Sequence, residues 1–490
     1  MPKFRKNVLL NNAPTMKKSK TSYEWEGFLS KKNKLVANVN SFSLNLLAEY
    51  NETLKEGVVF EVRLDDYKCT TEHIEIRWFA TVISIHGYRV LARYLGAETD
   101  EEDFYINFLS GDVHSVGHAQ FAENEGKQRR MYCPPPFIMD NLKQDEIANY
   151  VQKKLDSFKN GLSLARGYDN HKKSVFKSNF TIGNRIELLN YQNSREIRIA
   201  RIKNICGRRL NVLIEQDDLV GEVEENDDRQ MNLVGNEYWI DQDSFFIFPV
   251  GWAEYNNFDY NATEEYKEHA TRIAKALKED KVPQYSSIDT TPDLFRKISF
   301  DSHAWSQVKK NQKLELIDPL DQTFQNLKVA TVLDFCQTQG YLIIGIDGPD
   351  QLDESLPLYI VSPFIFPVGY AEKHGLNLTP PSDWEDGKFS WAKYMAKENT
   401  EPLPIELFKP ENETRPGFEI GMKLEAADMC ENQFICPATV KQASGRTILV
   451  GFDGWSNEYD ELYDVDSHDI FPIGWCEIHG HCLQQPTSKR

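Results

Sequence analysis

The chain has 490 residues, a formal net charge of −19 and 40% hydrophobic residues. This length predicts several globular domains, and the acidic balance argues against broad binding of duplex nucleic acid, whose affinity depends on neutralisation of phosphates by Lys and Arg. A basic partner suits this charge better. The longest apolar runs are too short to cross a bilayer, and the N-terminus lacks the apolar core of a signal peptide, so neither membrane insertion nor secretion is expected.

Residues 1–22 are polar and basic, and we expect them to form a disordered tail. They hold Arg5 and Lys6, then ten other residues, then the run Lys17-Lys18-Ser19-Lys20. Two basic clusters at this spacing resemble a bipartite nuclear-import signal, and a plain basic tail without a targeting role is the alternative.

Four stretches end in a related motif that contains a glycine, and they divide the chain into repeats. The motifs are DVHSVGH at 112–118, FFIFPVGW at 245–252, PFIFPVGY at 363–370 and DIFPIGW at 469–475. Their glycines, Gly117, Gly251, Gly369 and Gly474, are 134, 118 and 105 residues apart. This spacing is too long for a solenoid unit and suits a small domain with its connection.

Upstream of each motif lies a similar succession of three β-type runs, which are rich in Val, Ile, Thr and Phe and are separated by turn residues. The runs cover 59–66, 76–85 and 88–96 in the first repeat; 185–190, 197–205 and 209–216 in the second; 313–318, 327–335 and 341–348 in the third; and 422–428, 435–442 and 446–453 in the fourth. Several short strands at close spacing predict a small β-barrel in each repeat, and therefore a mainly β fold.

Helical patterning is confined to the connections between repeats. Residues 143–158 and 263–280 carry apolar side chains on one helical face, so they are expected to form arms that pack between the barrels. Breaks are indicated by the prolines at 134–136 and by the stretch 286–293. We therefore expect a tail at 1–22, followed by repeats at 23–138, 139–258, 259–376, which includes the helical linker, and 377–482.

The fourth repeat carries the most specific combination of motifs. These are FSWAKYM at 389–395, PxxLF at 404–408, GMKLEAAD at 421–428, CPATV at 436–440, FDGWxxEYD at 452–460 and FPIGWC at 471–476. Together they resemble the MBT (malignant brain tumour) repeat family of chromatin proteins in its four-repeat form. The resemblance implies four barrels, each with an extended arm that contains short helices. It also implies a nuclear, chromatin-associated transcriptional repressor in which one repeat reads methylated lysine on a histone tail, with histone H3 as the expected tail.

A candidate cage for such a cation lies in the fourth repeat. Phe452, Trp455 and Tyr459 surround an FDGW turn, and aromatic faces attract a methylated ammonium through their negative quadrupoles. Asp428 would supply a carboxylate, which favours a mono- or dimethyl ammonium that still has an N–H to donate. The resemblance adds secondary contacts from Glu431 or Asn432, where an asparagine is usual.

The alternative for the three aromatic residues is a place in the barrel core, although Trp455 follows a glycine turn and has polar neighbours, as a residue at a loop rim does. The other repeats lack the aromatic set. Ile346 and Pro349 replace it in the third repeat, Ile214 replaces the phenylalanine in the second, and Ala97 replaces the tryptophan in the first. The sequence therefore predicts one methyl-lysine reader and three structural or partner-binding copies.

Other classes of function find little support. Cys476, His479, His481 and Cys482 lie in CEIHGHC, but their spacing matches none of the usual structural zinc sites, so no metal or other cofactor is expected. The chain has no phosphate-binding glycine loop, GxSxG or HExxH motif, so it is not expected to be an enzyme. The remaining alternative is a scaffold that binds other subunits of a repressor complex independently of methylation.

Overall fold

The structure is a computed structural model of the whole chain. It describes residues 3–4, 22–50, 52–64, 74–120, 129–139, 146–158, 162–165, 167–190, 193–214, 237–297, 300, 302–319, 321, 324–336, 340–349, 351, 355–385, 387–411 and 416–486. The two basic clusters of the expected import signal, at 5–6 and 17–20, lie outside the described residues. Within the described residues, no helix is long and apolar enough to span a membrane.

Each repeat forms one curled, mainly antiparallel sheet, and the described residues contain four such sheets. The first sheet consists of β1 (Lys3–Phe4), β2 (Val59–Arg63), β3 (Ile74–His86), β4 (Arg89–Tyr94), β5 (Phe104–Asn107), β6 (Val113–His114) and β7 (Arg129–Tyr132). The second consists of β8 (Arg185–Leu189), β9 (Glu196–Cys206), β10 (Arg209–Ile214), β11 (Glu237–Asp241), β12 (Ile247–Phe248) and β13 (Asp259–Asn261). The third consists of β14 (Lys313–Ile317), β15 (Leu327–Cys336), β16 (Tyr341–Ile346), β17 (Leu356–Tyr359), β18 (Ile365–Phe366) and β19 (Leu378–Thr379). The fourth consists of β20 (Lys423–Ala427), β21 (Ile435–Ser444), β22 (Thr447–Phe452), β23 (Glu461–Asp464) and β24 (Ile470–Phe471).

The strand order is the same in all four sheets. The first four long strands pair as successive antiparallel neighbours, and the two-residue strand before the motif glycine pairs with the other edge of the first, as in the order β23-β22-β21-β20-β24. The longest strands of the four sheets are β3, β9, β15 and β21, in each case the second of the successive long strands. Each contains a register shift, for example between Val440 and Gln442 of β21. Such bulges bend a strand and increase its twist, which curls the sheet around its apolar face. The mainly β fold and the twelve expected strand runs are confirmed.

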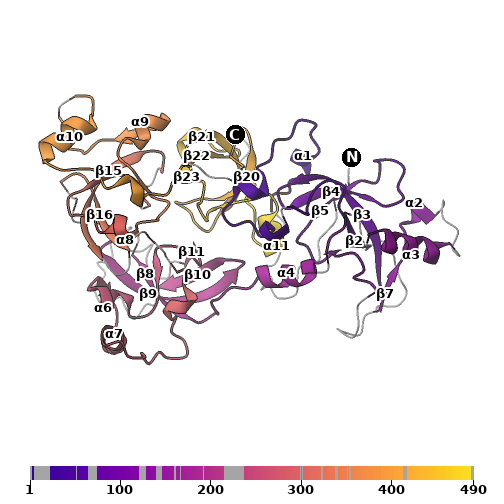
Figure 1. Cartoon of the computed structure of the whole chain (residues 1–490), viewed down its shortest axis with the longest axis horizontal. Coiled ribbons are helices and arrows are strands. Elements are labelled where there is room, and N and C mark those ends of the chain that lie inside the picture. Colours follow the sequence, from indigo (N-terminus) through magenta and orange to yellow (C-terminus); the bar gives the residue numbers. More distant parts are fainter. Residues whose placement is uncertain are drawn as a thin grey trace, which may run out of the picture.

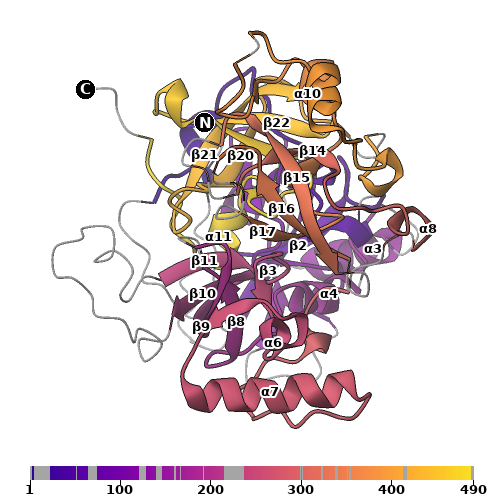
Figure 2. The same cartoon turned by 90° about the vertical axis from the view of Figure 1, so that its left-hand side faces the viewer.

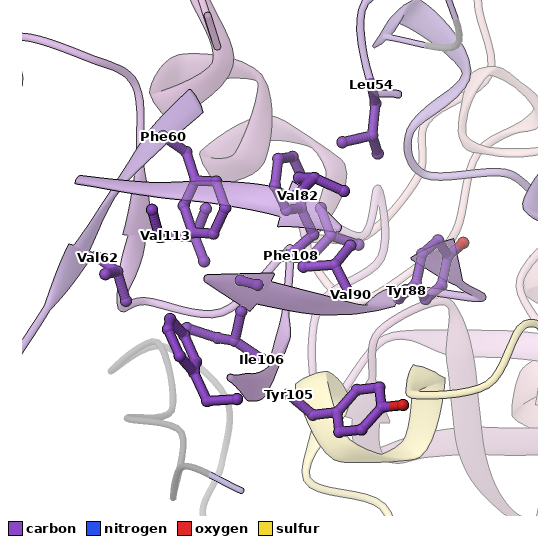
Figure 3. Close-up of a cluster of buried hydrophobic side chains, with 14 of the residues drawn as sticks. Leu54, Phe60, Val62, Val82, Tyr88, Val90, Tyr105, Ile106, Phe108 and Val113 are labelled. Carbon is purple, nitrogen blue, oxygen red and sulfur yellow. The ribbon is translucent and has the colours of Figure 1, made fainter. Parts of the chain in front are cut away.

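Alternating side chains of each sheet point into its concave face and form a core. In the first repeat, Phe60, Val82, Val90, Ile106 and Phe108 come together from successive strands and are almost fully buried (Figure 3). The β-branched and aromatic residues that suggested strands in the sequence are therefore also the residues that fill the core.

Helices are short and lie mainly in the connections. They are α1 (Glu26–Leu29), α2 (Pro136–Met139), α3 (Ile147–Phe158), α4 (Gly167–Val175), α6 (Trp252–Asn256), α7 (Glu264–Lys278), α8 (Ser302–Trp305), α9 (Tyr370–His374), α10 (Trp391–Glu398) and α11 (Trp475–His479), with 3-10 turns η1 (Val39–Ser41), η2 (Ala48–Tyr50), η4 (Pro292–Leu294), η5 (Ile405–Leu407) and η6 (Asn457–Tyr459). The two helices expected at 143–158 and 263–280 are confirmed as α3 and α7 within the described residues. The expectation that they pack between the barrels is wrong, because the apolar face of each helix covers a single repeat: α3 packs on Trp78 and Phe79 of the first, and α7 packs on Ile199 and Val250 of the second. The hydroxyl of Thr263 caps α7 by accepting the N–H of Tyr266, which satisfies one of its free backbone donors.

A buried glutamate in the first strand of every sheet holds the motif glycine in place. The glutamates are Glu61, Glu187, Glu315 and Glu425, and each carboxylate accepts the backbone N–H of the motif glycine and of the residue two positions later, at 2.6–3.1 Å. The glycines have φ of 86–93°, a left-handed conformation that costs other residues energy. This requirement explains why a glycine marks all four repeats.

A third donor to each glutamate comes from a different segment of the chain. Tyr132 and Tyr266 donate to Glu61 and Glu187, and Trp391 of α10 donates to Glu315 of the preceding, third repeat at 2.8 Å. In the fourth repeat, the donor to Glu425 is Trp25 near the start of the chain, at 2.9 Å.

The N-terminal segment thus completes the last repeat. Tyr23 N–H donates to the carbonyl of Leu483, and Ala37 N–H donates to the carbonyl of Lys423. The segment YEWEGFL at 23–29 is similar to FSWAKYM at 389–395. The two segments are therefore equivalent arms, which pack on the fourth and third sheets respectively. Figure 1 shows α1 beside β20, although the two are almost 400 residues apart in the sequence.

The second, third and fourth repeats are grouped together, and the first repeat attaches to the side of the fourth (Figure 1). Arg209 of the second repeat donates to the carbonyl of Asn432 in the fourth at 2.6 Å, and Ser194 of the second donates to Ser355 of the third. Asn107 of the first repeat donates to the carbonyl of Gly474 beside α11. Figure 2 shows α7 and α10 at opposite ends of this group, on the outer sides of the second and third repeats.

Candidate functional site

Two loops at one end of the fourth sheet carry most of the expected site residues. The first loop, 428–434, joins β20 to β21 and is closed by a hydrogen bond from Asp428 N–H to the carbonyl of Phe434, at 3.1 Å. The second, 453–460, joins β22 to β23 and includes η6. In it, Trp455 N–H donates to the carbonyl of Phe452, and Gly454 supplies the positive φ of 87° that the turn requires.

The three aromatic residues have different surroundings. Trp455 and Tyr459 are exposed, at 44% and 50% of their full accessible surface, whereas Phe452 is 6% exposed and belongs to the core cluster of the sheet. The rings of Trp455 and Tyr459 meet edge to face, with centroids 5.3 Å apart and an interplanar angle of 71°. The core alternative therefore holds for Phe452, while the other two rings leave faces open to a ligand.

Asp428 supplies a half-buried carboxylate at the start of the first loop. Its Oδ1 accepts the backbone N–H groups of Cys430 at 2.9 Å and Glu431 at 2.8 Å. These bonds fix the carboxylate in one orientation. Burial raises the pKa of Asp428 above its usual value, and the two N–H donors act in the opposite direction.

The two secondary contacts separate in the structure. Glu431 is exposed, and its carboxylate accepts the side-chain amide of Gln433 at 2.6 Å. The side-chain oxygen of Asn432 instead accepts the N–H of Trp239, at 3.1 Å, so Asn432 contributes to the contact with the second repeat. It also lines a cavity of about 440 Å³ between the second, third and fourth repeats, which Asp428 borders as well.

Glu461 is a buried acid beside this site that the sequence reasoning missed. It pairs with Val450 across β22 and β23, and Val450 lies two residues before Phe452, so all three side chains are on the inward face of the sheet. Burial and the neighbouring Asp428 raise the pKa of Glu461 to about 8. The available signal was the position of Glu461 two residues before Tyr463 in the run ELYD, because residues two apart in a strand lie on the same face.

The third repeat supports the second loop from outside. Gln325 donates to the carbonyls of Asn457 at 3.1 Å and Glu458 at 2.8 Å, and the carbonyl of Phe324 accepts the N–H of Leu462 at 2.7 Å. This contact orients η6, which carries Tyr459. No local pattern in the sequence indicates it, because the partners are more than 130 residues apart.

The corresponding positions of the other repeats do not present this set. In the third repeat, Asp318 forms an ion pair with Lys328 at 2.7 Å, and Pro349 stands where the fourth repeat has its tryptophan. In the second, Ile214 is buried at the end of β10, and Asn190 donates to Glu196. Among the described loops at these positions, the exposed Trp–Tyr pair occurs in the fourth repeat.

Two clusters among the described residues group enough nitrogen, sulfur or oxygen donors to hold a metal ion. Asp428, Cys430 and Glu461 form one, and His114, His118 and Asp169 form the other. The CEIHGHC residues form no such group in the described part of the chain. Their side chains have other contacts, since His479 packs on Trp475 and His481 on Trp239.

The cluster of His114, His118 and Asp169 takes the place of an aromatic pair that the other three repeats have around the motif glycine. In those three repeats an aromatic pair is in contact across the motif glycine, such as Phe248 with Trp252, whose centroids are 4.0 Å apart. In the first repeat, His114 and His118 stack instead at 3.7 Å, and the carboxylate of Asp169 on α4 contacts Nδ1 of both rings. The cluster thereby ties the first sheet to the arm that follows it.

Comparison with known proteins agrees with this architecture. The family model described as "mbt repeat" matches residues 184–267, 312–385 and 422–490. The chain is 48% identical to "Protein lin-61" of Caenorhabditis elegans, over 99% of this chain and 79% of that protein, and 36% identical to "Malignant brain tumor repeat protein 1" of the same organism, over 90% and 81%. A crystal structure of the four MBT repeats of Drosophila melanogaster Sfmbt, in complex with the peptide RHR(me)KVLR, matches with a TM-score of 0.76 and 29% identity, covering 95% of this chain and 99% of that one. The chain belongs to the MBT repeat family.

Proposed function

We propose that the fourth repeat binds methylated lysine on a basic histone tail, and that histone H3 is the tail. The observation that carries this proposal is the exposed pair of Trp455 and Tyr459 in a loop at the same end of the sheet as the fixed carboxylate of Asp428. Further support comes from the Sfmbt structure, which was solved with a methylated, arginine-rich peptide. The net charge of −19 also favours approach of a basic peptide.

The chemistry of the cage follows from its residues. A methylated lysine keeps its positive charge and gains apolar surface, which suits the open faces of Trp455 and Tyr459. Phe452, buried beneath them, forms the apolar floor. Asp428 accepts the remaining N–H of a mono- or dimethyl ammonium, so these states bind more tightly than a trimethyl ammonium, which has no N–H to donate.

In the cell, this binding places the protein on chromatin in the nucleus, where it acts as a transcriptional repressor. It does so as a binding protein and not as an enzyme. Its partners are the histone tail and, through the first three repeats, other subunits of a repressor complex. A basic import signal at 5–6 and 17–20 fits this location.

The test is a titration of methylated and unmethylated H3 peptides with wild-type protein and Trp455→Ala. Each cation–π wall contributes about 0.5–2 kcal/mol, so we expect this variant to lose about twofold to thirtyfold in affinity, with an unchanged melting temperature. Pro349→Ala is the matched control, because Pro349 is exposed at the equivalent position of the third repeat and its replacement leaves affinity unchanged.

Equal affinity of Trp455→Ala and wild type for the methylated peptide contradicts the proposal. Equal binding of methylated and unmethylated peptides by wild type also contradicts it, and favours the alternative of a methylation-independent scaffold.

A further inference from the structure

The register of the fourth sheet places a second acid under the candidate cage. Glu461 is 3% exposed, and its side chain lies on the inward face of β23, opposite Val450 and next to Phe452. Its oxygens lie within 4.8 Å of donor atoms of Asp428 and Cys430, and the two carboxyl groups are within hydrogen-bonding reach. Two buried carboxyl groups this close repel each other when both are ionised.

Few groups near Glu461 can compensate a second negative charge. Its Oε2 accepts the N–H of Met429 at 3.1 Å and the hydroxyl of Tyr463, which remain neutral donors. The nearby Cys430 thiol stays protonated, because burial and the two acids raise its pKa to about 12. Two further charged groups act on this cluster: Glu431 acts on Asp428, and Asp321 of the third repeat acts on Cys430. Both are acidic, although Asp321 is paired with Lys328.

We infer that Glu461 is a second acid of the cage, which shares a proton with Asp428 in the free protein and releases it when a methylated lysine binds. This inference rests on the proposed function of the same site. In the free protein, protonated Glu461 donates to the carboxylate of Asp428. The arriving ammonium replaces that proton as the positive charge beside Asp428, and the proton passes to the solvent.

The direction of the pH dependence follows from the buried pair. Burial and Asp428 hold the pKa of Glu461 near 8 in the free protein, and a cation beside the pair lowers it, because an opposite charge favours the ionised form. Peptide affinity therefore rises with pH up to about 8 and is constant above it. A bound cation within about 4–6 Å lowers such a pKa by about 1–3 units, so affinity increases by about sevenfold to seventyfold between pH 6 and pH 8.5.

The experiment is isothermal titration of the full chain at pH 7 with a dimethyl-lysine peptide that lacks histidine. It is carried out in two buffers of different ionisation enthalpy, which measures the protons released on binding. We expect release of about 0.4–0.9 proton per peptide for wild type, none for Glu461→Gln, and a pH-independent affinity for that variant. Asp460→Asn is the matched control: Asp460 is a neighbouring buried acid that faces Lys441, so the variant retains the proton release.

The outcomes separate the inference from the proposed function. If wild type binds the methylated peptide selectively but releases no proton, the inference is wrong and the proposed function stands. The same follows if Glu461→Gln keeps the pH dependence. If wild type shows no preference for the methylated peptide at any pH, the proposed function is wrong and the inference with it. The wild-type measurement decides the matter even where the variant does not fold.

Discussion

Removing one hydrogen bond at the start of the chain should loosen the last repeat. Trp25 is 2% exposed and donates its indole N–H to the buried carboxylate of Glu425, which in turn holds the N–H groups of Gly474 and Cys476. Trp25→Phe keeps an aromatic ring against its neighbours Tyr23 and Phe28 but removes the donor.

The magnitude follows from the burial of Glu425. A hydrogen bond to a charged group contributes about 1.5–3 kcal/mol, and the Oε1 atom that loses the indole N–H keeps the N–H of Gly474. The smaller ring adds a void worth about 1 kcal/mol. We therefore expect the fourth repeat to lose about 2–4 kcal/mol of local stability, although the substitution lies 400 residues from Glu425 in β20.

Hydrogen exchange followed by mass spectrometry measures this effect by region. In Trp25→Phe, amides of β20, β24 and α11 should exchange faster, while those of the third sheet keep their protection. Trp391→Phe is the matched variant, because Trp391 makes the same bond to Glu315, and it should affect β14 and α9 instead. Unchanged exchange of residues 470–480 in Trp25→Phe would refute the reasoning.

Two further predictions concern stability. Gly474→Ala should destabilise the protein by about 1–3 kcal/mol, because Gly474 has a φ of 93° and a Cβ there would lie 2.7 Å from the side-chain nitrogen of Asn107. Gly27→Ala is the control, because a Cβ at Gly27 meets nothing within 4 Å. Equal urea midpoints for the two variants would contradict this account. Burial raises the folded-state pKa of Glu461 to about 8. In wild type, the stabilising contribution of this group is therefore full below its unfolded pKa and is lost as the pH rises to about 8 and the group ionises. Because Gln does not ionise, the melting temperature of Glu461→Gln should increasingly exceed that of wild type as the pH rises from about 4.5 to 8. A pH-independent difference in thermal melts would show that Glu461 is not the titrating group.

Much of the fold was readable from local pattern. The runs around Val59, Ile197, Val329 and Ile448 became strands because β-branched and aromatic residues at these positions both favour extended backbone and fill the core. The short closing strands, such as β24, were not predicted as strands, because two residues carry no periodicity and pair only after the sheet has curled.

The candidate site was predicted in part. Trp455 beside Gly454 indicated an exposed rim, and the structure agrees, because a tryptophan in a polar turn has no core to enter. The burial of Phe452 and the location of Asn432 in a contact between repeats depend on the neighbouring surfaces. Glu461 is polar in sequence and buried in the structure, so composition alone places it on the wrong side of the sheet.

The sequence by itself determined that there are four related β repeats and that one carries an aromatic set suited to a cation. It did so because strand alternation, turn glycines and clustered aromatic residues are local properties. Only the tertiary structure decided that Trp25 completes the fourth repeat, that Gln325 supports the cage loop, and that Glu461 lies beneath Asp428. These contacts join residues that are distant in the chain or on opposite faces of a loop, and they form only when the sheets pack.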